Sequence, residues 1–186
     1  MFNAKVIPGF LSEEDCKYVV DVVSKLDTWE GAGNEFWANR ALNLPNIRKN
    51  IDPKVADIVA DAIIRLKQTI MSEYKLDKEV YHDTAQVIRW FPGMEQPPHA
   101  DDMTNTEHKG FEHRVFGAII YLNDNYSGGH TYYPQHGIEV TPKAGTLAIH
   151  PGDTDHIHGV TKIEGTTRYT IASFWCYDKL REYPLN

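Results

Sequence analysis

The chain has 186 residues, of which 41% are hydrophobic and 24% charged, and its formal net charge is −7. This length suits one domain with a full hydrophobic core, so we expect a single domain over residues 1–186. The acidic balance argues against a partner bound through a nucleic-acid backbone. No apolar run approaches the roughly 18 residues of a membrane span, so no membrane partner is expected.

The beginning of the sequence and its two cysteines bear on location and metal chemistry. "MFNAKVIPGFLSEEDC" lacks the basic segment and the apolar core of a secretory signal, which predicts a cytoplasmic protein. Cys16 and Cys176 have no C-x-x-C spacing, so neither a thiolate metal site nor a disulfide framework is expected. Any metal would have to be held by histidine and carboxylate.

Two helices are predicted in the N-terminal part, about residues 1–78. The first follows Ser12, whose side chain can cap it, and has apolar residues at helical spacing up to Leu26. The second has Asp52 as its cap and Pro53 at its first position, and an apolar stripe of helical period follows. These helices are expected to support a larger unit that comes after them.

The segment between the two helices, residues 28–46, has no clear period. It is rich in glycine, asparagine and aromatic residues, which is typical of a loop. We expect residues 30–45 to form a loop or a lid. Trp29 and Trp37 would either belong to that lid or anchor the loop to the core, and the sequence does not separate the two roles.

From about residue 79 to about residue 180 the pattern changes to short runs rich in β-branched and aromatic residues. Turn residues such as Pro-Gly and Asn-Asp separate the runs. Many short strands after two helices predict an α+β chain whose larger part is a sandwich or jelly roll. The predicted strands lie within 79–91, 114–122, 130–134, 137–142, 145–150, 155–160 and 167–177.

A histidine and an aspartate follow two prolines in "PPHADD", residues 97–102. The prolines favour extended backbone, in which His99 and Asp101 point to the same side. "TDHIHGV", near the other end of the β region, supplies a third ligand in His158, with His156 as its rival. Two histidines and one carboxylate form the facial triad of non-haem Fe(II) oxygenases, which leaves positions open for substrate and O₂.

An arginine stands ten residues after His158, at the start of "RYTIASFW". Alternation along this predicted strand directs Arg168 and Thr170 to one face. A guanidinium matches a carboxylate with its planar fork, and a neighbouring hydroxyl can add a hydrogen bond. Arg168 therefore predicts a site for the distal carboxylate of a dicarboxylic cosubstrate.

Five blocks in this order resemble the 2-oxoglutarate- and Fe(II)-dependent dioxygenases, and within them the prolyl 4-hydroxylase-like branch. They are "VIRWFPG", "HAD", "RVFGAIIYLND" followed by "GGHTYYP", "VTPKAGTLAIHP" and "HGVTKIEGTTRYTIASFW". The resemblance covers nearly all of residues 84–177. It implies a double-stranded β-helix, which is a jelly roll, with supporting N-terminal helices. It also implies hydroxylation of an unactivated C–H bond with Fe(II), 2-oxoglutarate and O₂, releasing succinate and CO₂.

The resemblance implies that His99, Asp101 and His158 are the iron ligands. It favours His158 over His156, because only His158 stands ten residues before an arginine. Arg168 would hold the distal carboxylate of 2-oxoglutarate, and Thr170 beside it would add a contact. Ascorbate is a further cofactor that the resemblance suggests.

Further positions agree with the family or depart from it. Tyr121 matches a position whose hydroxyl assists the 2-oxoglutarate carboxylate, and Arg114 matches an arginine that lies near the substrate in some relatives. Several relatives carry a tyrosine before the Pro-Gly that precedes the ligand pair, where this chain has Trp90 and Phe91. His130 stands where an acidic residue is common. Because Trp90 and Phe91 have no hydroxyl, the contact that the family tyrosine makes with the cosubstrate is missing here.

The remaining histidines have no partner at comparable spacing and are expected to be exposed or hydrogen-bonded: His82, His108, His113, His130, His136 and His150. Asp102 is expected to lie outside the ligand set.

The sequence leaves three functions as candidates. The first is a prolyl hydroxylase acting on a peptide, the second a hydroxylase of a small molecule such as a free amino acid, and the third a jelly-roll metal-binding protein without catalysis. A nucleic-acid demethylase is disfavoured, because such members of the family typically carry a second arginine where this chain has Phe174.

Overall fold

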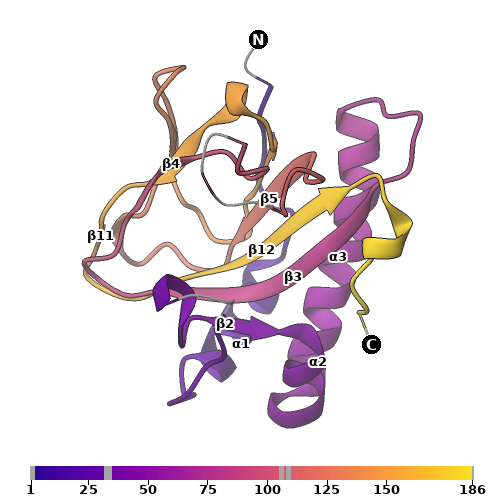
Figure 1. Ribbon diagram of the computed structural model, residues 1–186. Coiled ribbons are helices and arrows are strands. Elements are labelled where there is room, and N and C mark those ends of the chain that lie inside the picture. The colour runs from indigo at the N-terminus through magenta and orange to yellow at the C-terminus, as the bar shows by residue number, and fades with distance from the viewer. Residues whose placement is uncertain (1–2, 32–34, 105–106, 108–109, 186) are drawn as a thin grey trace.

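A six-stranded antiparallel sheet, in the order β1-β9-β5-β12-β3-β2, carries the fold (Figure 1). The computed structural model describes residues 3–31, 35–104, 107 and 110–185. The neighbours β3 and β12 are the longest strands, and they pair along nearly their whole length. The strands of this sheet are β1 (Lys5–Ile7), β2 (Ala41–Asn43), β3 (Tyr81–Trp90), β5 (Phe116–Tyr121), β9 (Leu147–Pro151) and β12 (Arg168–Cys176).

Two smaller sheets form the second layer of the jelly roll. A four-stranded sheet has the order β4-β10-β7-β8, and a two-stranded sheet pairs β11 with β6. All seven runs predicted as strands contain one. The strands of the second layer are β4 (Gln96–His99), β6 (Ser127–Gly128), β7 (Thr131–Tyr133), β8 (Ile138–Val140), β10 (His158–Val160) and β11 (Ile163–Glu164).

Helices cover the outer face of the large sheet. Both predicted caps are confirmed: Ser12 accepts a hydrogen bond from the amide of Asp15, and Asp52 accepts hydrogen bonds from the amides of Lys54 and Val55. The first helix ends before Leu26, which packs against the core from the following turn. The helices are α1 (Glu13–Val23), α2 (Leu44–Asn46), α3 (Pro53–Glu73), the π-helical η2 (Ile47–Ile51), and the 3-10 turns η1 (Glu35–Trp37), η3 (Thr154–His156) and η4 (Lys179–Arg181).

The large sheet has two faces of different chemistry. On the outer face, Val87 and Ile171 join Val59 and Leu66 of α3 in one apolar cluster. The inner face turns toward the smaller sheets, where Ile88 and Trp90 of β3 pack with Val160 and Ile163. Since side chains alternate along a strand, the residues that alternate with the outer apolar set face the space between the two layers.

The prediction of a loop or lid over residues 30–45 is wrong for the second half of this segment. Residues 32–34 lie outside the described part of the chain. Ala41–Asn43 forms the edge strand β2, which pairs with β3. Trp29 is buried in the main core, and the Trp37 ring contacts Trp90 with centroids 5.4 Å apart. Both tryptophans therefore anchor this segment to the sheet.

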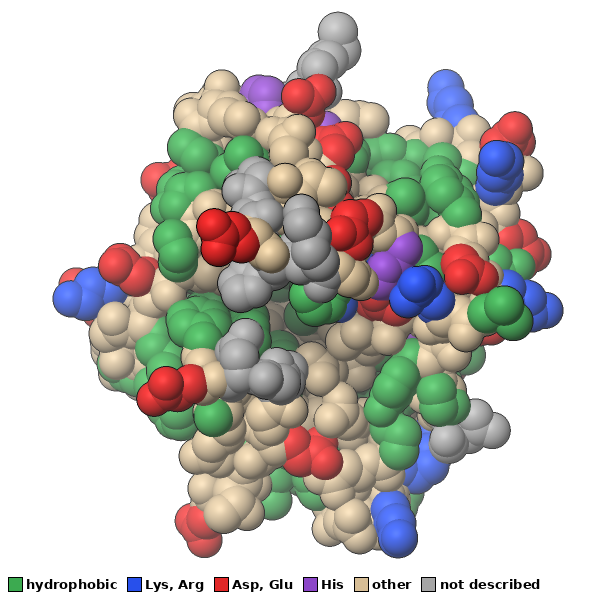
Figure 2. Space-filling model, in the orientation of Figure 1, with side chains coloured by type: hydrophobic (Ala, Val, Ile, Leu, Met, Phe, Trp, Pro, Cys, Tyr) green, Lys and Arg blue, Asp and Glu red, His purple; other side chains and the backbone are tan. Residues whose placement is uncertain are grey.

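The surface seen in Figure 2 carries charges of both signs. Lysine and arginine side chains lie singly or beside acidic ones on this face. Among the described residues, no helix combines the length and the apolar composition that crossing a bilayer requires.

The cap of α3 generates a prediction for stability. Partial desolvation opposes ionisation of Asp52, but hydrogen bonds from the Val55 amide, the Tyr18 hydroxyl and the Lys54 amide keep its pKa below the usual value. A depressed folded pKa contributes stability above the unfolded pKa of about 3.9, and this contribution is lost as pH falls through the folded value. Asp52→Ala should lower the free energy of unfolding by about 1 kcal/mol at pH 7.

This difference should shrink as pH falls from about 4 through the folded pKa of Asp52, because the wild-type carboxylate is then progressively protonated and its contribution is lost. Urea denaturation at pH 7 and pH 3 measures it, with Asp77→Ala in an exposed turn as the control. An equal loss for Asp52→Ala at both pH values would contradict the account.

Candidate metal and cosubstrate site

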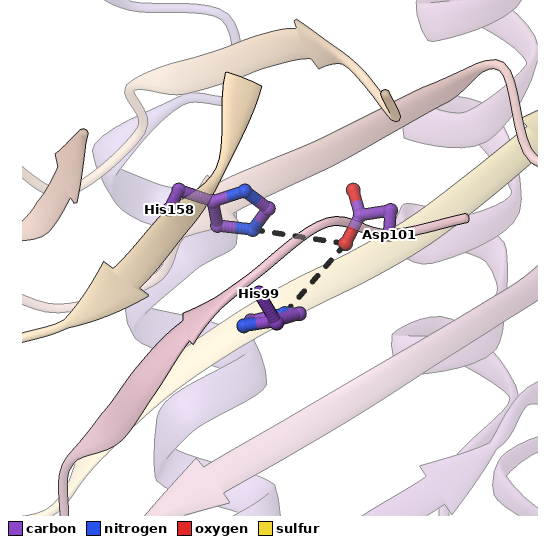
Figure 3. Close-up of side chains that lie close together, drawn as sticks. All are labelled: His99, Asp101 and His158. Atoms are coloured by element: carbon purple, nitrogen blue, oxygen red, sulfur yellow. Dashed lines mark ion pairs between the residues drawn. The ribbon is translucent and has the colours of Figure 1, made fainter. Parts of the chain in front are cut away.

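Two neighbouring strands bring the predicted metal ligands together. β4 and β10 are antiparallel, and His99 lies directly opposite His158 in their register. Asp101 follows two residues after His99, at the turn that ends β4 (Figure 3). The Oδ1 atom of Asp101 lies 3.8 Å from Nε2 of His99 and 3.6 Å from Nε2 of His158. The donor atoms of these three side chains all lie within 4.8 Å of one another.

Backbone carbonyls fix the orientation of both histidine rings. Nδ1 of His158 lies 3.0 Å from the carbonyl oxygen of His156, and Nδ1 of His99 lies 3.1 Å from that of Pro97. A carbonyl only accepts, so each Nδ1 carries the proton and donates it. Each Nε2 then presents its lone pair toward Asp101. Carbonyl partners of this kind hold a histidine in the tautomer that binds a metal.

Burial and neighbouring groups shift the pKa values of Asp101 and His158 in the directions that favour metal binding. Burial alone would raise the pKa of Asp101, but the surrounding His158, His150 and His99 rings, and a hydrogen bond from His150, hold it well below its usual value. Burial, with the neighbouring His150 and His99 rings, lowers the pKa of His158 to about 3. At neutral pH the centre therefore offers one carboxylate and neutral imidazole, as metal ligation requires.

The rival ligand and the second aspartate lie apart from this centre. Nδ1 of His156 lies 2.7 Å from Oδ1 of Asp153, and its Nε2 accepts a hydrogen bond from the amide of Asn3. Asp102 accepts hydrogen bonds from the amide and the hydroxyl of Thr104 through one carboxylate oxygen. Neither side chain belongs to the cluster of His99, Asp101 and His158, and Asp102 was expected to lie outside it.

One of the remaining histidines is closer to the centre than its spacing suggested. Nε2 of His150 lies 2.9 Å from Oδ2 of Asp101, so His150 contacts a predicted ligand. His108 lies outside the described residues. The others lie away from the ligand atoms and contact protein groups: His82 (Trp175 ring), His113 (Asp83), His130 (Glu139) and His136 (Asp155 carbonyl).

The predicted cosubstrate arginine is buried without a complete set of partners. Arg168 is 1% exposed, and its Nε and Nη2 find no hydrogen-bond partner among the described residues. Tyr121 lies beside it, with its ring centroid 5.3 Å from the guanidinium carbon, and its hydroxyl is 2.7 Å from Oγ1 of Thr131. Thr170 is buried on the same face, opposite Tyr121. Unpaired buried guanidinium nitrogens call for an anion, which a carboxylate supplies.

Two further residues near Arg168, between the two layers, were not predicted from the sequence. Arg40 is buried against Trp90, 4.1 Å from the ring centroid, and its Nη2 finds no partner among the described residues. Burial and the charge of Arg168 lower the pKa of Arg40 to about 10. The hydroxyl of Tyr126 is also buried without a described partner. Neither residue stands in a recognisable motif, so only the fold reveals them.

Tyr126 lies near Arg168, whereas Trp90 stands at the position where the sequence predicted a missing hydroxyl. Trp90 pairs directly with Arg168 across β3 and β12, and its ring lies 5.5 Å from the guanidinium carbon. A side-chain carbon built on Gly129 would meet both the Tyr126 ring and the Arg168 side chain, at 2.8 and 3.0 Å. Tyr126 and Arg168 are therefore neighbours, and Tyr126 brings a phenol hydroxyl to a region where Trp90 has none.

A sequence profile described as the 2OG-Fe(II) oxygenase superfamily matches residues 85–177, half of the chain. This chain belongs to that superfamily. A curated relative from Acanthamoeba polyphaga mimivirus, named "Putative prolyl 4-hydroxylase", is 32% identical over 70 residues. That match covers 34% of this chain and only 29% of the relative.

Solved structures of other proteins have the same fold as this chain. A viral collagen prolyl hydroxylase from Paramecium Bursaria Chlorella virus-1 is 17% identical with a TM-score of 0.68, covering 95% of this chain and 97% of that one. A Trichoplax adhaerens prolyl hydroxylase, solved with a hypoxia inducible factor peptide fragment, is 15% identical with a TM-score of 0.72, covering 97% and 86%. These matches confirm the predicted α+β jelly roll with N-terminal helices.

Arg114 of this 2OG-Fe(II) oxygenase lies on the metal side of the large sheet. Its guanidinium carbon is 3.8 Å from the Phe174 ring centroid, and its Nε donates to Oδ2 of Asp83 at 3.0 Å. Phe174 pairs with Gly117, and a side-chain carbon on Gly117 would point at Asp101. Arg114 therefore packs on the strand surface that continues from the ligand centre.

The competition between His158 and His156 generates a prediction. His158→Ala should lower the affinity of the metal-free protein for Co(II) roughly 100-fold or more, since losing a hydrogen-bond partner of a ligand alone costs about 10–100-fold. His156→Ala should leave that affinity within about 2-fold, because only its backbone carbonyl touches the centre. Anaerobic calorimetry measures both variants, and a larger loss for His156→Ala would contradict the assignment.

Proposed function

We propose that this chain is a 2-oxoglutarate- and Fe(II)-dependent hydroxylase that acts on a prolyl residue of a peptide or protein. The observation that carries the proposal is the pairing, between the same two layers, of a buried His-Asp-His cluster with a buried guanidinium. Two nitrogens of that guanidinium, Nε and Nη2 of Arg168, have no hydrogen-bond partner among the described residues. Bound iron and 2-oxoglutarate would supply oxygen activation for hydroxylation, with release of succinate and CO₂. The protein's part is to hold, orient and enclose them.

His99 and His158, each through Nε2, and Asp101 through Oδ1 would hold the Fe(II). These groups give two neutral nitrogens and one negative oxygen, so the metal keeps a net positive charge that attracts an anionic cosubstrate. Three ligands on one face leave three positions, which suit a bidentate 2-oxo acid and O₂. The carboxylate of Asp101 occupies the position that a halide would need, which favours hydroxylation.

Arg168 would bind the distal carboxylate of 2-oxoglutarate. Tyr121 and Thr170 lie on the same sheet face, and Tyr126 adds a buried hydroxyl beside the guanidinium. The positive charge of Arg40 further favours a dianion over a monoanion at this end. Together these groups support selection of a dicarboxylic cosubstrate.

The substrate would approach along the inner face of the large sheet. Thr84, Gln86, Ala172 and Phe174 alternate along β3 and β12 and are only partly buried, in contrast to Arg168 and Trp90 at the closed end. Arg114 stacks on Phe174 at this open end, which supports a role near the substrate. A prolyl substrate is favoured by the relatives whose names specify prolyl hydroxylation, one of them solved with a peptide.

Two other functions remain as alternatives. A hydroxylase of a free amino acid would use the same metal and cosubstrate groups, but the open end of the sheet face would bind a small molecule in place of a peptide. A metal-binding protein without catalysis is disfavoured by the buried, incompletely paired Arg168, which such a protein would not need. An accessory role for ascorbate, a cytoplasmic location and the lack of a nucleic-acid partner stay predictions from the sequence.

Binding of metal and cosubstrate together is the first test. Anaerobic addition of Fe(II) and 2-oxoglutarate should produce a weak visible metal-to-ligand charge-transfer band, and Asp101→Ala should abolish it. Arg168→Met should raise the half-saturating 2-oxoglutarate concentration about 100-fold, and Tyr126→Phe about 5-fold, because charge-assisted hydrogen bonds are the stronger ones. Arg65→Met, on the exposed side of α3, is the matched control. No band in the wild type, or one insensitive to Arg168→Met, would overturn the proposal.

Substrate class is tested by 2-oxoglutarate turnover. Proline-containing peptides should raise succinate production at least ~10-fold over the uncoupled rate, whereas free proline should not, since only a peptide extends along the open face. Arg114→Gln should raise the KM for the peptide and leave the half-saturating 2-oxoglutarate concentration unchanged. Stimulation by free amino acids alone would instead favour the small-molecule hydroxylase.

A further inference from the structure

A buried chain of hydrogen bonds lies behind the predicted metal-binding carboxylate. The Tyr133 hydroxyl is 2.9 Å from Nδ1 of His150, and Nε2 of His150 is 2.9 Å from Oδ2 of Asp101. The three side chains are 0%, 1% and 4% exposed, in that order. His150 lies in β9 and Tyr133 in β7, so the chain links the two layers of the jelly roll.

The direction of each hydrogen bond follows from the acceptor at its end. An ionised carboxylate only accepts, so Nε2 of His150 carries a proton and donates it to Asp101. Nδ1 of His150 is left to pair with the Tyr133 hydroxyl, which donates to it. Burial keeps Tyr133 protonated, since it raises the pKa of that phenol well above its usual value. Both nitrogens of His150 are thus engaged, and neither offers a lone pair to a metal.

The two oxygens of Asp101 have separate partners. Oδ1 faces Nε2 of His99 and Nε2 of His158, whereas Oδ2 accepts from His150. A carboxylate whose second oxygen is engaged in this way binds a metal through one oxygen only. Without that hydrogen bond it could turn and bind through both oxygens, which would fill one of the positions a facial triad leaves open.

Gly117 provides the space in which the Asp101–His150 hydrogen bond lies. A side-chain carbon at residue 117 would lie 1.9 Å from Oδ2 of Asp101 and 2.7 Å from Nε2 of His150. Any residue larger than glycine would push the two groups apart. Gly117 is the second residue of the strand β5 and is paired with Phe174, so available space, and not a turn, explains glycine at this position.

We infer that Tyr133 and His150 are positioning residues that hold Asp101 as a one-oxygen metal ligand and keep three metal positions open for 2-oxoglutarate and O₂. This inference rests on the proposed function, because it needs a metal at the His99, Asp101 and His158 centre. It adds two residues that do not touch the metal and act through the orientation of a ligand. Hydrogen-bond partners of metal ligands typically contribute about 10–100-fold to metal affinity.

The test measures metal binding and not turnover. His150→Phe in the full chain should lower Co(II) affinity about 10–100-fold and change the Co(II) visible spectrum, because the geometry of Asp101 changes. His150→Gln, which keeps an N–H donor, should restore part of both. His82→Phe is the matched control: His82 is likewise a buried histidine, but it packs against Trp175 away from the centre. It should leave affinity and spectrum unchanged.

Tyr133→Phe removes one hydroxyl with little change of shape and decides the question should His150→Phe fail to fold. It should lower Co(II) affinity about 3–10-fold, in line with the loss of one buried hydrogen bond. Wild-type affinity and spectrum in Tyr133→Phe, or in a folded His150→Phe, would overturn the inference. Failure of the wild type to bind Co(II) or Fe(II) would instead refute the proposed function, so the two failures are distinguishable.

Discussion

A buried carboxylate is costly unless hydrogen bonds or opposite charge compensate it. Asp101 is 4% exposed, and it accepts a hydrogen bond from His150, which helps to keep its pKa low. The local structure follows from this requirement. β4 and β10 pair so that His99 faces His158, and β5 has glycine where Asp101 needs room. Because neutral histidines leave a net negative charge at this centre, a cation completes it.

The region around Arg168, at the closed end of the space between the two layers, carries an excess of positive charge. Arg168 and Arg40 are both buried next to Trp90, and each has a nitrogen without a described partner. A ligand that is anionic at its far end and chelates a cation at its near end satisfies both regions at once. β12 connects them, since it carries Arg168 at its start and passes Gly117, beside Asp101, near its end. The spacing between the two charges is thereby set by the most extensively paired part of the fold.

The sequence predicted those features that have a local or periodic signal. The caps Ser12 and Asp52 act through their own backbone neighbours, and the seven predicted strands alternate or carry β-branched runs. The short strand Ala41–Asn43 was missed because three residues show no period and its pairing with β3 is a tertiary contact. Arg40 was missed for a similar reason: the Phe36 ring is a local partner, but Trp90 belongs to β3 and reaches Arg40 only through the fold.

The site residues that could be predicted are those that lie at a recognisable spacing along the chain. His99 and Asp101 are two residues apart, and His158 and Arg168 are ten apart, so a pattern exists to find. His150 has no such pattern: in "LAIHP" it looks like one polar residue in an apolar strand. Its role depends on Asp101 lying 49 residues earlier and Tyr133 lying 17 residues earlier, which only the packing of the two layers brings into contact.

The most direct test of this account is anomalous X-ray diffraction from crystals of the protein loaded with Mn(II) and 2-oxoglutarate under anaerobic conditions. The account predicts one anomalous peak within about 2.3 Å of Nε2 of His99, Oδ1 of Asp101 and Nε2 of His158. Oδ2 of Asp101 should stay on His150, and the distal carboxylate should lie on Arg168. A peak at His156 and Asp153, or a cosubstrate carboxylate away from Arg168, would contradict it.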